Sequence, residues 1–126
     1  MEERYGHPWS REETILAFDL YCKIPFSKIS RRNKQIIELA DLLGRTPSSV
    51  ALKMTNLASY DQKLKIRGIK GMKNTSKLDG QVWEEFLNNW ENLAYEAQLI
   101  LYKRKQIQLY KKTSFLESDN LLLGQY

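Results

Sequence analysis

The spacing of apolar residues near the start of the chain is typical of an amphipathic helix. From Ser10 to Cys22, Ile15 and Phe18 fall on one face at helical spacing. Ser10 and Glu13 form the Ser-x-x-Glu pattern of a capping box, in which each residue satisfies a backbone N–H of the first turn. The pattern therefore predicts a first helix that begins after Ser10.

A second helix is predicted from Asn33 to Leu43. Its broad apolar face consists of Ile36, Ile37, Leu39, Ala40 and Leu43. Gly44 follows at the position of a left-handed C-cap, which favours glycine because no Cβ is present. The second helix should therefore end in a sharp turn.

A third helix is predicted to start at once, with Thr46 as its N-cap and Pro47 at its first position. The residues expected to face the core are Val50, Ala51, Met54, Leu57 and Ala58. Those expected to point outward are Ser48, Ser49, Lys53 and Asn56, with Leu52 at the margin. No acidic residue lies on this outward face, which can donate and accept hydrogen bonds.

Residues 60–78 interrupt the helical pattern at Gly68 and Gly71, and we expect an ordered loop with a short strand there. Its apolar residues, which should hold it against the body, are Leu64, Ile66, Ile69 and Met72. A long fourth helix is predicted from Asp79 to about Lys112. Its stripe consists of Val82, Phe86, Trp90, Leu93, Ala97 and Ile100.

The pattern predicts an all-α fold, in which a three-helix core with a helix-turn-helix is followed by a loop and a long helix. We assign residues 1–60 to this core, 61–78 to a basic loop, 79–112 to the long helix packed on the core, and 113–126 to a tail or linker.

Charge is distributed unevenly along the chain, whose formal net charge is +5. Residues 1–44 are neutral and residues 78–126 carry a net charge of −2, whereas residues 45–77 carry +7. The basic residues of this window are Arg45, Lys53, Lys63, Lys65, Arg67, Lys70, Lys73 and Lys77. Such concentration is typical of a phosphate-binding surface, and a solvated lysine-rich loop is the alternative.

Composition narrows the class of protein. The chain has 42% hydrophobic residues, no apolar run as long as a membrane span, and no apolar stretch in the opening MEERYGHPWS. A single cysteine, Cys22, permits no internal disulfide and fits a reducing compartment. We therefore expect a cytoplasmic globular protein with no membrane partner.

The chain offers little for catalysis. His7 is the only histidine, and Cys22 has no second histidine to activate it. We expect His7 to be exposed or structural, Cys22 to be a small core residue, and no cofactor or metal to be bound. The tryptophans Trp9, Trp83 and Trp90 lie on apolar stripes and should be core residues.

The first sixty residues resemble a Myb or SANT-type three-helix domain. The likeness rests on "PWSREETILAFDLY" and "LGRTPSSVALKMTNL" and covers residues 8–60. The family's later two tryptophans are absent, so Phe26, Met54 or Leu57 would fill their place. Ala40, Gly44 and Val50 stand at the close-packing, turn and anchor positions of a helix-turn-helix, whereas Arg45 and Lys53 occupy positions that are commonly apolar.

The whole chain resembles the N-terminal region of bacterial, restriction-like HNH endonucleases. This resemblance rests on "HPWSREETILAFDLYCKIPFSKIS", "LGRTPSSVALKMTNLASYD", "RGIKGMKNTSKLDGQVWEEFLNNWENLAYEA" and the closing "LLLGQY". It implies a DNA-binding or targeting module whose C-terminal HNH nuclease domain is not in this sequence. We therefore expect no catalytic activity from the chain itself.

We expect the third helix to enter the major groove of double-stranded DNA. Ser48, Ser49, Lys53 and Asn56 would approach bases, with Asn56 suited to adenine and Lys53 to guanine or a phosphate. Arg45 would hold the DNA backbone. The phosphate contacts of the loop would come from Lys63, Lys65, Arg67, Lys70 and Lys73, and Arg67 could also enter the minor groove.

Two alternatives stay open at this point. The fourth helix and tail could dock a nuclease domain or a second copy of the chain, because their apolar residues exceed what one face needs. The loop, with Tyr60 and Tyr95, could instead bind RNA or a single strand and show little preference for duplex.

Overall fold

The computed structural model describes residues 7–66 and 76–122, and this part of the chain is helical, with no strand. The elements are α1 (Arg11–Lys23), the short 3-10 helix η1 (Phe26–Lys28), α2 (Lys34–Leu43), α3 (Pro47–Ala58), α4 (Gln62–Ile66), α5 (Lys77–Phe86) and α6 (Trp90–Leu122). The predicted all-α fold is confirmed.

The start of α1 follows from its capping box. The Ser10 hydroxyl accepts a hydrogen bond from the Glu13 N–H at 3.1 Å, and the Glu13 carboxylate accepts one from the Ser10 N–H at 3.0 Å. These reciprocal bonds satisfy two donors that the first turn would otherwise leave unpaired. The helix ends at Lys23, one residue later than predicted, and Pro25 follows soon after.

Helices α2 and α3 are joined by a turn of three residues. Gly44 adopts φ 69°, the left-handed conformation predicted for it, and the Arg45 N–H closes the turn on the Ala40 carbonyl at 2.9 Å. The Thr46 hydroxyl then caps α3 by accepting from the Ser49 N–H, and Pro47 opens the helix. The predicted sharp turn between the second and third helices is confirmed.

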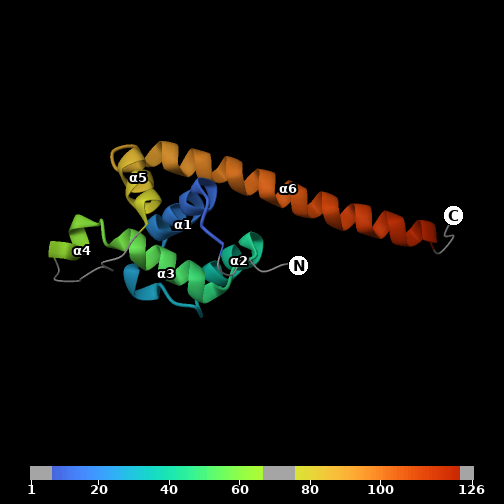
Figure 1. Ribbon diagram of the computed structural model, residues 1–126, viewed down its shortest axis with the longest axis horizontal. Coiled ribbons are helices and arrows are strands. Elements are labelled where there is room, and N and C mark those ends of the chain that lie inside the picture. The colour runs from blue at the N-terminus through green and yellow to red at the C-terminus, as the bar shows by residue number, and fades with distance from the viewer. Residues whose placement is uncertain (1–6, 67–75, 123–126) are drawn as a thin grey trace.

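The core lies between α1 and the helices around it. Phe18 of α1 stacks on Trp83 of α5 with ring centroids 4.7 Å apart, and both rings are buried. From α3, Val50, Met54 and Leu57 are fully buried, as their spacing predicts. In Figure 1, α6 crosses one side of the bundle, while α3 and the segment between η1 and α2 lie on the opposite side.

The predicted fourth helix is in fact two helices, because the chain turns at residues 87–89 between α5 and α6. Asn88 and Asn89 occupy this turn, and asparagine side chains compete with helical backbone hydrogen bonds. The stripe itself is largely confirmed, since Val82, Phe86, Leu93, Ala97 and Ile100 are buried. Trp90 is half exposed, although its ring still meets Phe18 edge to face.

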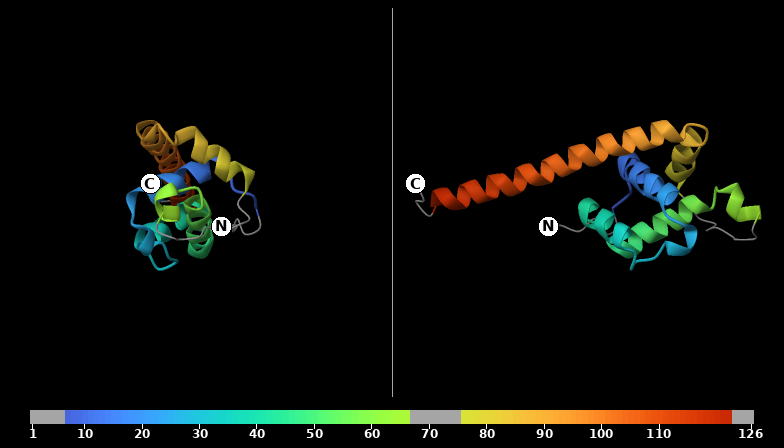
Figure 2. Two further views of the ribbon diagram at one scale, coloured as in Figure 1. Left: turned by 90° about the vertical axis from the view of Figure 1, so that its left-hand side faces the viewer. Right: turned by 180° about the vertical axis from the view of Figure 1, so that it is seen from behind.

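Helix α6 continues to Leu122, ten residues beyond the predicted end, so the start of the expected tail is helical. It extends well past the rest of the molecule (Figures 1 and 2). Its first part packs on α1, and among the side chains that the structure describes, which in α6 reach residue 114, the last buried one is Ile100. Residues 105–113 of α6 are all exposed.

Three smaller predictions were wrong. Ile37, assigned to the apolar face of α2, is exposed. Cys22 is exposed on α1 and is not a core residue, because it lies off the stripe that Ile15 and Phe18 bury. The beginning of the predicted loop forms α4, held down by the buried Leu64, while Ile69 and Met72 lie outside the described residues.

Candidate nucleic-acid interface

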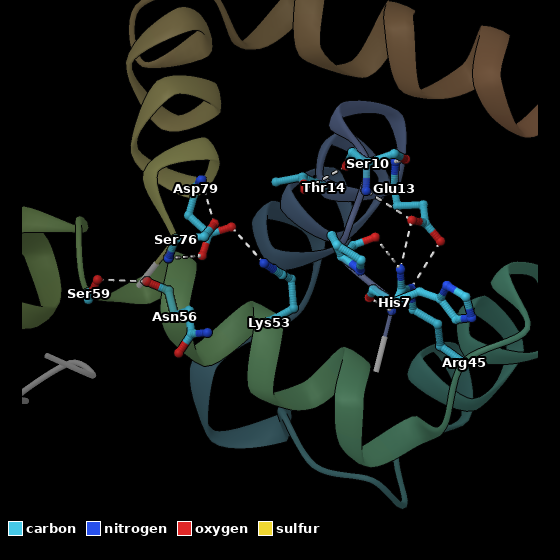
Figure 3. A network of polar contacts seen from close by, with 11 residues as sticks. His7, Ser10, Glu13, Thr14, Arg45, Lys53, Asn56, Ser59, Ser76 and Asp79 are labelled. Carbon is cyan, nitrogen blue, oxygen red and sulfur yellow. Dashed lines mark hydrogen bonds and ion pairs between the residues drawn. The ribbon is translucent and has the colours of Figure 1, made fainter. Parts of the chain in front are cut away.

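Arg45, predicted to hold the DNA backbone, is buried in the protein (Figure 3). Its guanidinium forms two 3.0 Å hydrogen bonds to the Glu13 carboxylate, and the two side chains are 3% and 1% exposed. It also donates to the carbonyls of His7 and Pro8 at 3.1 and 3.0 Å, and lies 4.5 Å from the centre of the Trp9 ring.

This geometry gives Arg45 a structural task. A buried charge is tolerated only when it is paired and hydrogen-bonded, and the fork of guanidinium donors meets that condition here. The residue ties the segment before α1 to the turn between α2 and α3. The prediction that Arg45 faces DNA was wrong, because Glu13, 32 residues earlier, takes up its charge.

Lys53 was also expected to face outward, and it does not. Its ammonium group lies 2.8 Å from the Asp79 carboxylate of α5, and the two side chains are 8% and 0% exposed. The ammonium nitrogen is 5.2 Å from the centre of the Trp9 ring. Asp79 also accepts a hydrogen bond from the Ser76 N–H within the capping box of α5 (Figure 3). Because α5 covers this side of α3, Lys53 is a core residue.

The free face of α3 is mostly uncharged. Ser48 and Leu52 are exposed, and Ser49, Thr55 and Asn56 are partly exposed. Leu52, placed at the margin by its spacing, is 50% exposed. The Asn56 carboxamide oxygen is enclosed, and no hydrogen bond reaches it within the described part of the chain. This face carries hydroxyl, amide and methyl groups and no carboxylate.

A basic segment leads into α2, and we did not predict it from the sequence. We call residues 28–34 the basic linker, since Lys28, Arg31, Arg32 and Lys34 are all exposed there. Among the residues that the structure describes, none of the four forms an ion pair. The basic linker lies with α3 on the side of the bundle away from α6 (Figures 1 and 2).

A finer charge count could have found the basic linker. Residues 24–37 contain these four cations and no acidic residue, but they are averaged away when residues 1–44 are treated as one neutral block. The basic linker is also brought close to α3 only by the fold. The positive charge of the basic linker is therefore visible in the sequence when charge is counted over a short window.

Of the predicted loop residues, Lys63 and Lys65 are exposed on α4. Arg67, Lys70 and Lys73 lie outside the described residues. The start of α4 is anchored to α1 because the Tyr21 hydroxyl donates to the Asp61 carboxylate at 2.7 Å. Burial, followed by this hydrogen bond, raises the pKa of Tyr21 well above its usual value.

Within 7–66 and 76–122, no three His, Cys, Asp or Glu side chains are grouped so that they could hold a metal ion. Desolvation, aided by the nearby carboxylates of Asp19 and Asp61, raises the pKa of Cys22 to about 11. None of the described helices is apolar over a length that could cross a membrane.

Comparison with protein-family models, with curated proteins and with solved structures finds no match to this chain.

Proposed function

We propose that this chain is a double-stranded DNA-binding module that inserts α3 into the major groove. Its resemblance to the N-terminal region of restriction-like HNH endonucleases supports a target-recognition role beside a nuclease domain that this sequence does not contain. The Myb-like pattern of residues 8–60 supports the same use of the third helix.

The observation that carries the proposal is the charge of the side away from α6. The basic linker presents four exposed cations without an ion-pair partner among the described residues, on the same side of the bundle as α3, whose free face has no carboxylate. Neighbouring cations without partners repel one another, which destabilises the fold, and the negative charges of a phosphate backbone would offset this repulsion.

The first turns of the helices support this assignment. Neither α2 nor α3 has an acidic residue in its first turn, whereas α1, α5 and α6 each have at least one. Acidic residues are favourable at helix N-termini because they complement the helix dipole. Their absence from α2 and α3 leaves both N-termini suited to phosphate groups.

The proposed contacts differ from those inferred from the sequence. Ser48 and Ser49 remain the candidates for base edges, together with Asn56, whose enclosed oxygen leaves only its N–H donors for such a contact. Leu52 adds an apolar contact suited to a thymine methyl group. Arg45 and Lys53 are no longer among the proposed DNA contacts, because their charges are paired inside the protein. Phosphate contacts come from the basic linker and from Lys63 and Lys65. Arg67, Lys70 and Lys73 stay phosphate contacts as predicted from the sequence.

Single-stranded nucleic acid is a weaker candidate. Stacking on a base requires a free aromatic face, but Tyr60 is partly buried with its ring stacked 6.1 Å from that of Trp83. This contact removes one of the two tyrosines on which that alternative depended. Duplex DNA therefore fits the described surface better.

The proposal is tested by titrating the chain into a labelled mixed-sequence duplex at several salt concentrations. Binding should weaken steeply with salt, and Arg31→Ala/Arg32→Ala should reduce the slope of log K against log salt by about two. Lys111→Ala/Lys112→Ala, which removes two exposed cations from α6, should change the slope by less than half a unit.

Absence of duplex binding at low salt would refute the proposal. So would equal effects of the two double variants, because binding would then follow total charge and not the basic linker. A matched single strand that competes as well as duplex would transfer the assignment to single-stranded nucleic acid.

A further inference from the structure

Helix α6 has apolar residues on two opposite faces. Leu93, Ala97 and Ile100 are buried on the face that packs against the bundle. On the opposite face lie the apolar residues Tyr95, Leu99, Tyr102 and Leu109, together with the polar Gln106 and Thr113, and we call these six the outer stripe. All six are exposed, and Tyr102, the most exposed member beside the bundle, is 64% exposed. The bundle covers one face of α6 and leaves the outer stripe exposed.

The spacing of the outer stripe is that of a coiled-coil seam. Its members alternate at intervals of four and three residues, so Tyr95, Tyr102 and Leu109 recur every seven residues, and Leu116 continues the interval in the sequence. A repeat of 3.5 residues brings a helix face repeatedly against a partner that has the same repeat. A helix that only packs against a globular body does not need this interval on its solvent face.

We propose that the outer stripe pairs with the outer stripe of a second copy of this chain, to form a parallel two-stranded coiled coil. Identical stripes are complementary to each other, because a two-fold axis places the same residues on both sides of the interface. The bundle lies on the far face of α6, so it leaves the outer stripe accessible to the partner helix.

The residues on either side of the outer stripe favour parallel pairing of α6 with α6 of a second copy. Parallel pairing places Gln98 beside Lys103 of the second copy and Lys105 beside Tyr110, so no like charges meet at these positions. An antiparallel register that covers Leu109 with Leu99 would bring Lys103 against Lys103 and Lys105 against Lys105. The parallel arrangement also covers Leu109, which lies beyond the last buried residue of α6.

The length of α6 also supports a partner helix along the outer stripe. Its 33 residues span about 50 Å, but the last buried residue among the described side chains, which end at residue 114, is Ile100, eleven residues into the helix. Long isolated helices depend on packing for most of their stability, and residues 105–113 of α6, which are all exposed, receive little from the bundle. A partner helix along the outer stripe would supply that packing.

Sedimentation equilibrium of the whole chain tests this proposal independently of DNA. We expect a dimer at micromolar concentration, and a monomer for Leu99→Glu/Leu109→Glu, whose circular dichroism should keep the signal of the folded bundle. Ile107→Glu is the matched control, because Ile107 is an equally exposed apolar residue of α6 outside the outer stripe, and it should leave the dimer intact.

Orientation is tested by Leu109→Cys in a Cys22→Ser background. Parallel pairing brings the two introduced thiols together, so oxidation should give a disulfide-linked dimer. A wild-type monomer at about 100 µM, or a dimer that survives Leu99→Glu/Leu109→Glu, would overturn the proposal. Failure of the cross-link in a dimer that this double variant disrupts would overturn the parallel orientation.

Discussion

Lys53 of α3 and Asp79 of α5 form an ion pair of 2.8 Å, although 26 residues separate them in the chain. Both side chains are buried, and the pair lies beside the Trp9 ring. The contact joins the helix-turn-helix to the helices that follow it. It makes a lysine that looks like a DNA ligand in the sequence into part of the protein's own core.

Replacing one partner of this pair should destabilise the fold strongly. Asp79→Ala leaves a buried ammonium group uncompensated, which costs about 3–5 kcal/mol of unfolding free energy. Urea unfolding at neutral pH measures the change. Lys53→Met/Asp79→Leu should recover most of the loss, because it removes both charges and keeps apolar volume. A loss under 1 kcal/mol in Asp79→Ala would contradict the buried pairing.

Arg45→Lys should also destabilise the protein, despite keeping the charge. A lysine ammonium cannot reproduce the paired bonds to Glu13 together with those to the carbonyls of His7 and Pro8. We expect a loss of about 1.5–3 kcal/mol in unfolding free energy. Thermal unfolding checks this, with the exposed Arg32→Lys as the matched control. Equal stability of the two variants would argue against the buried role of Arg45.

Asn56→Ala should alter the choice of DNA sequence and leave the phosphate contacts unchanged. If Asn56 reads a base, its loss should cost about 1–3 kcal/mol on the preferred site and little on other sites. Selection of sites from a random library, followed by titration at two salt concentrations, separates the two effects. An unchanged site preference, or a reduced salt slope, would remove Asn56 from the base contacts.

Cys22 should react slowly with alkylating reagents although it is exposed. Its pKa of about 11 means that the thiolate is about 0.1% of the thiol at pH 8, against about a quarter for an ordinary thiol. Raising the pKa favours the protonated form, so the alkylation rate should climb about tenfold per pH unit to about pH 10. Iodoacetamide labelling of folded and urea-unfolded chain measures this, and a plateau near pH 9 in the folded chain would contradict the shift.

The boundaries of α1 and α2 and the start of α3 could be predicted from the sequence. The capping box of Ser10, the left-handed Gly44 and the Thr46-Pro47 start of α3 are each confirmed. These signals act over three or four residues, so each segment carries the information for its own end. The turn at Asn88 and Asn89 had a local signal as well, but the continuous apolar stripe on either side of it concealed the break.

The proposed interface could be predicted only in part. The free polar face of α3 was identified correctly at Ser48, while the cations assigned beside it were wrong at Arg45 and Lys53. The basic linker was missed although its cations are adjacent in the sequence. Its relation to α3 depends on how the three helices pack, which no local pattern specifies.

The sequence by itself determined the first three helices, their caps and the uneven distribution of charge, because these depend on neighbours within a few residues. Only the tertiary structure decided which cations are free. Arg45 is taken up by Glu13 and Lys53 by Asp79, partners that lie 32 and 26 residues away along the chain. A charged side chain is exposed or buried according to the segment that packs over it, and that segment is chosen by the whole fold.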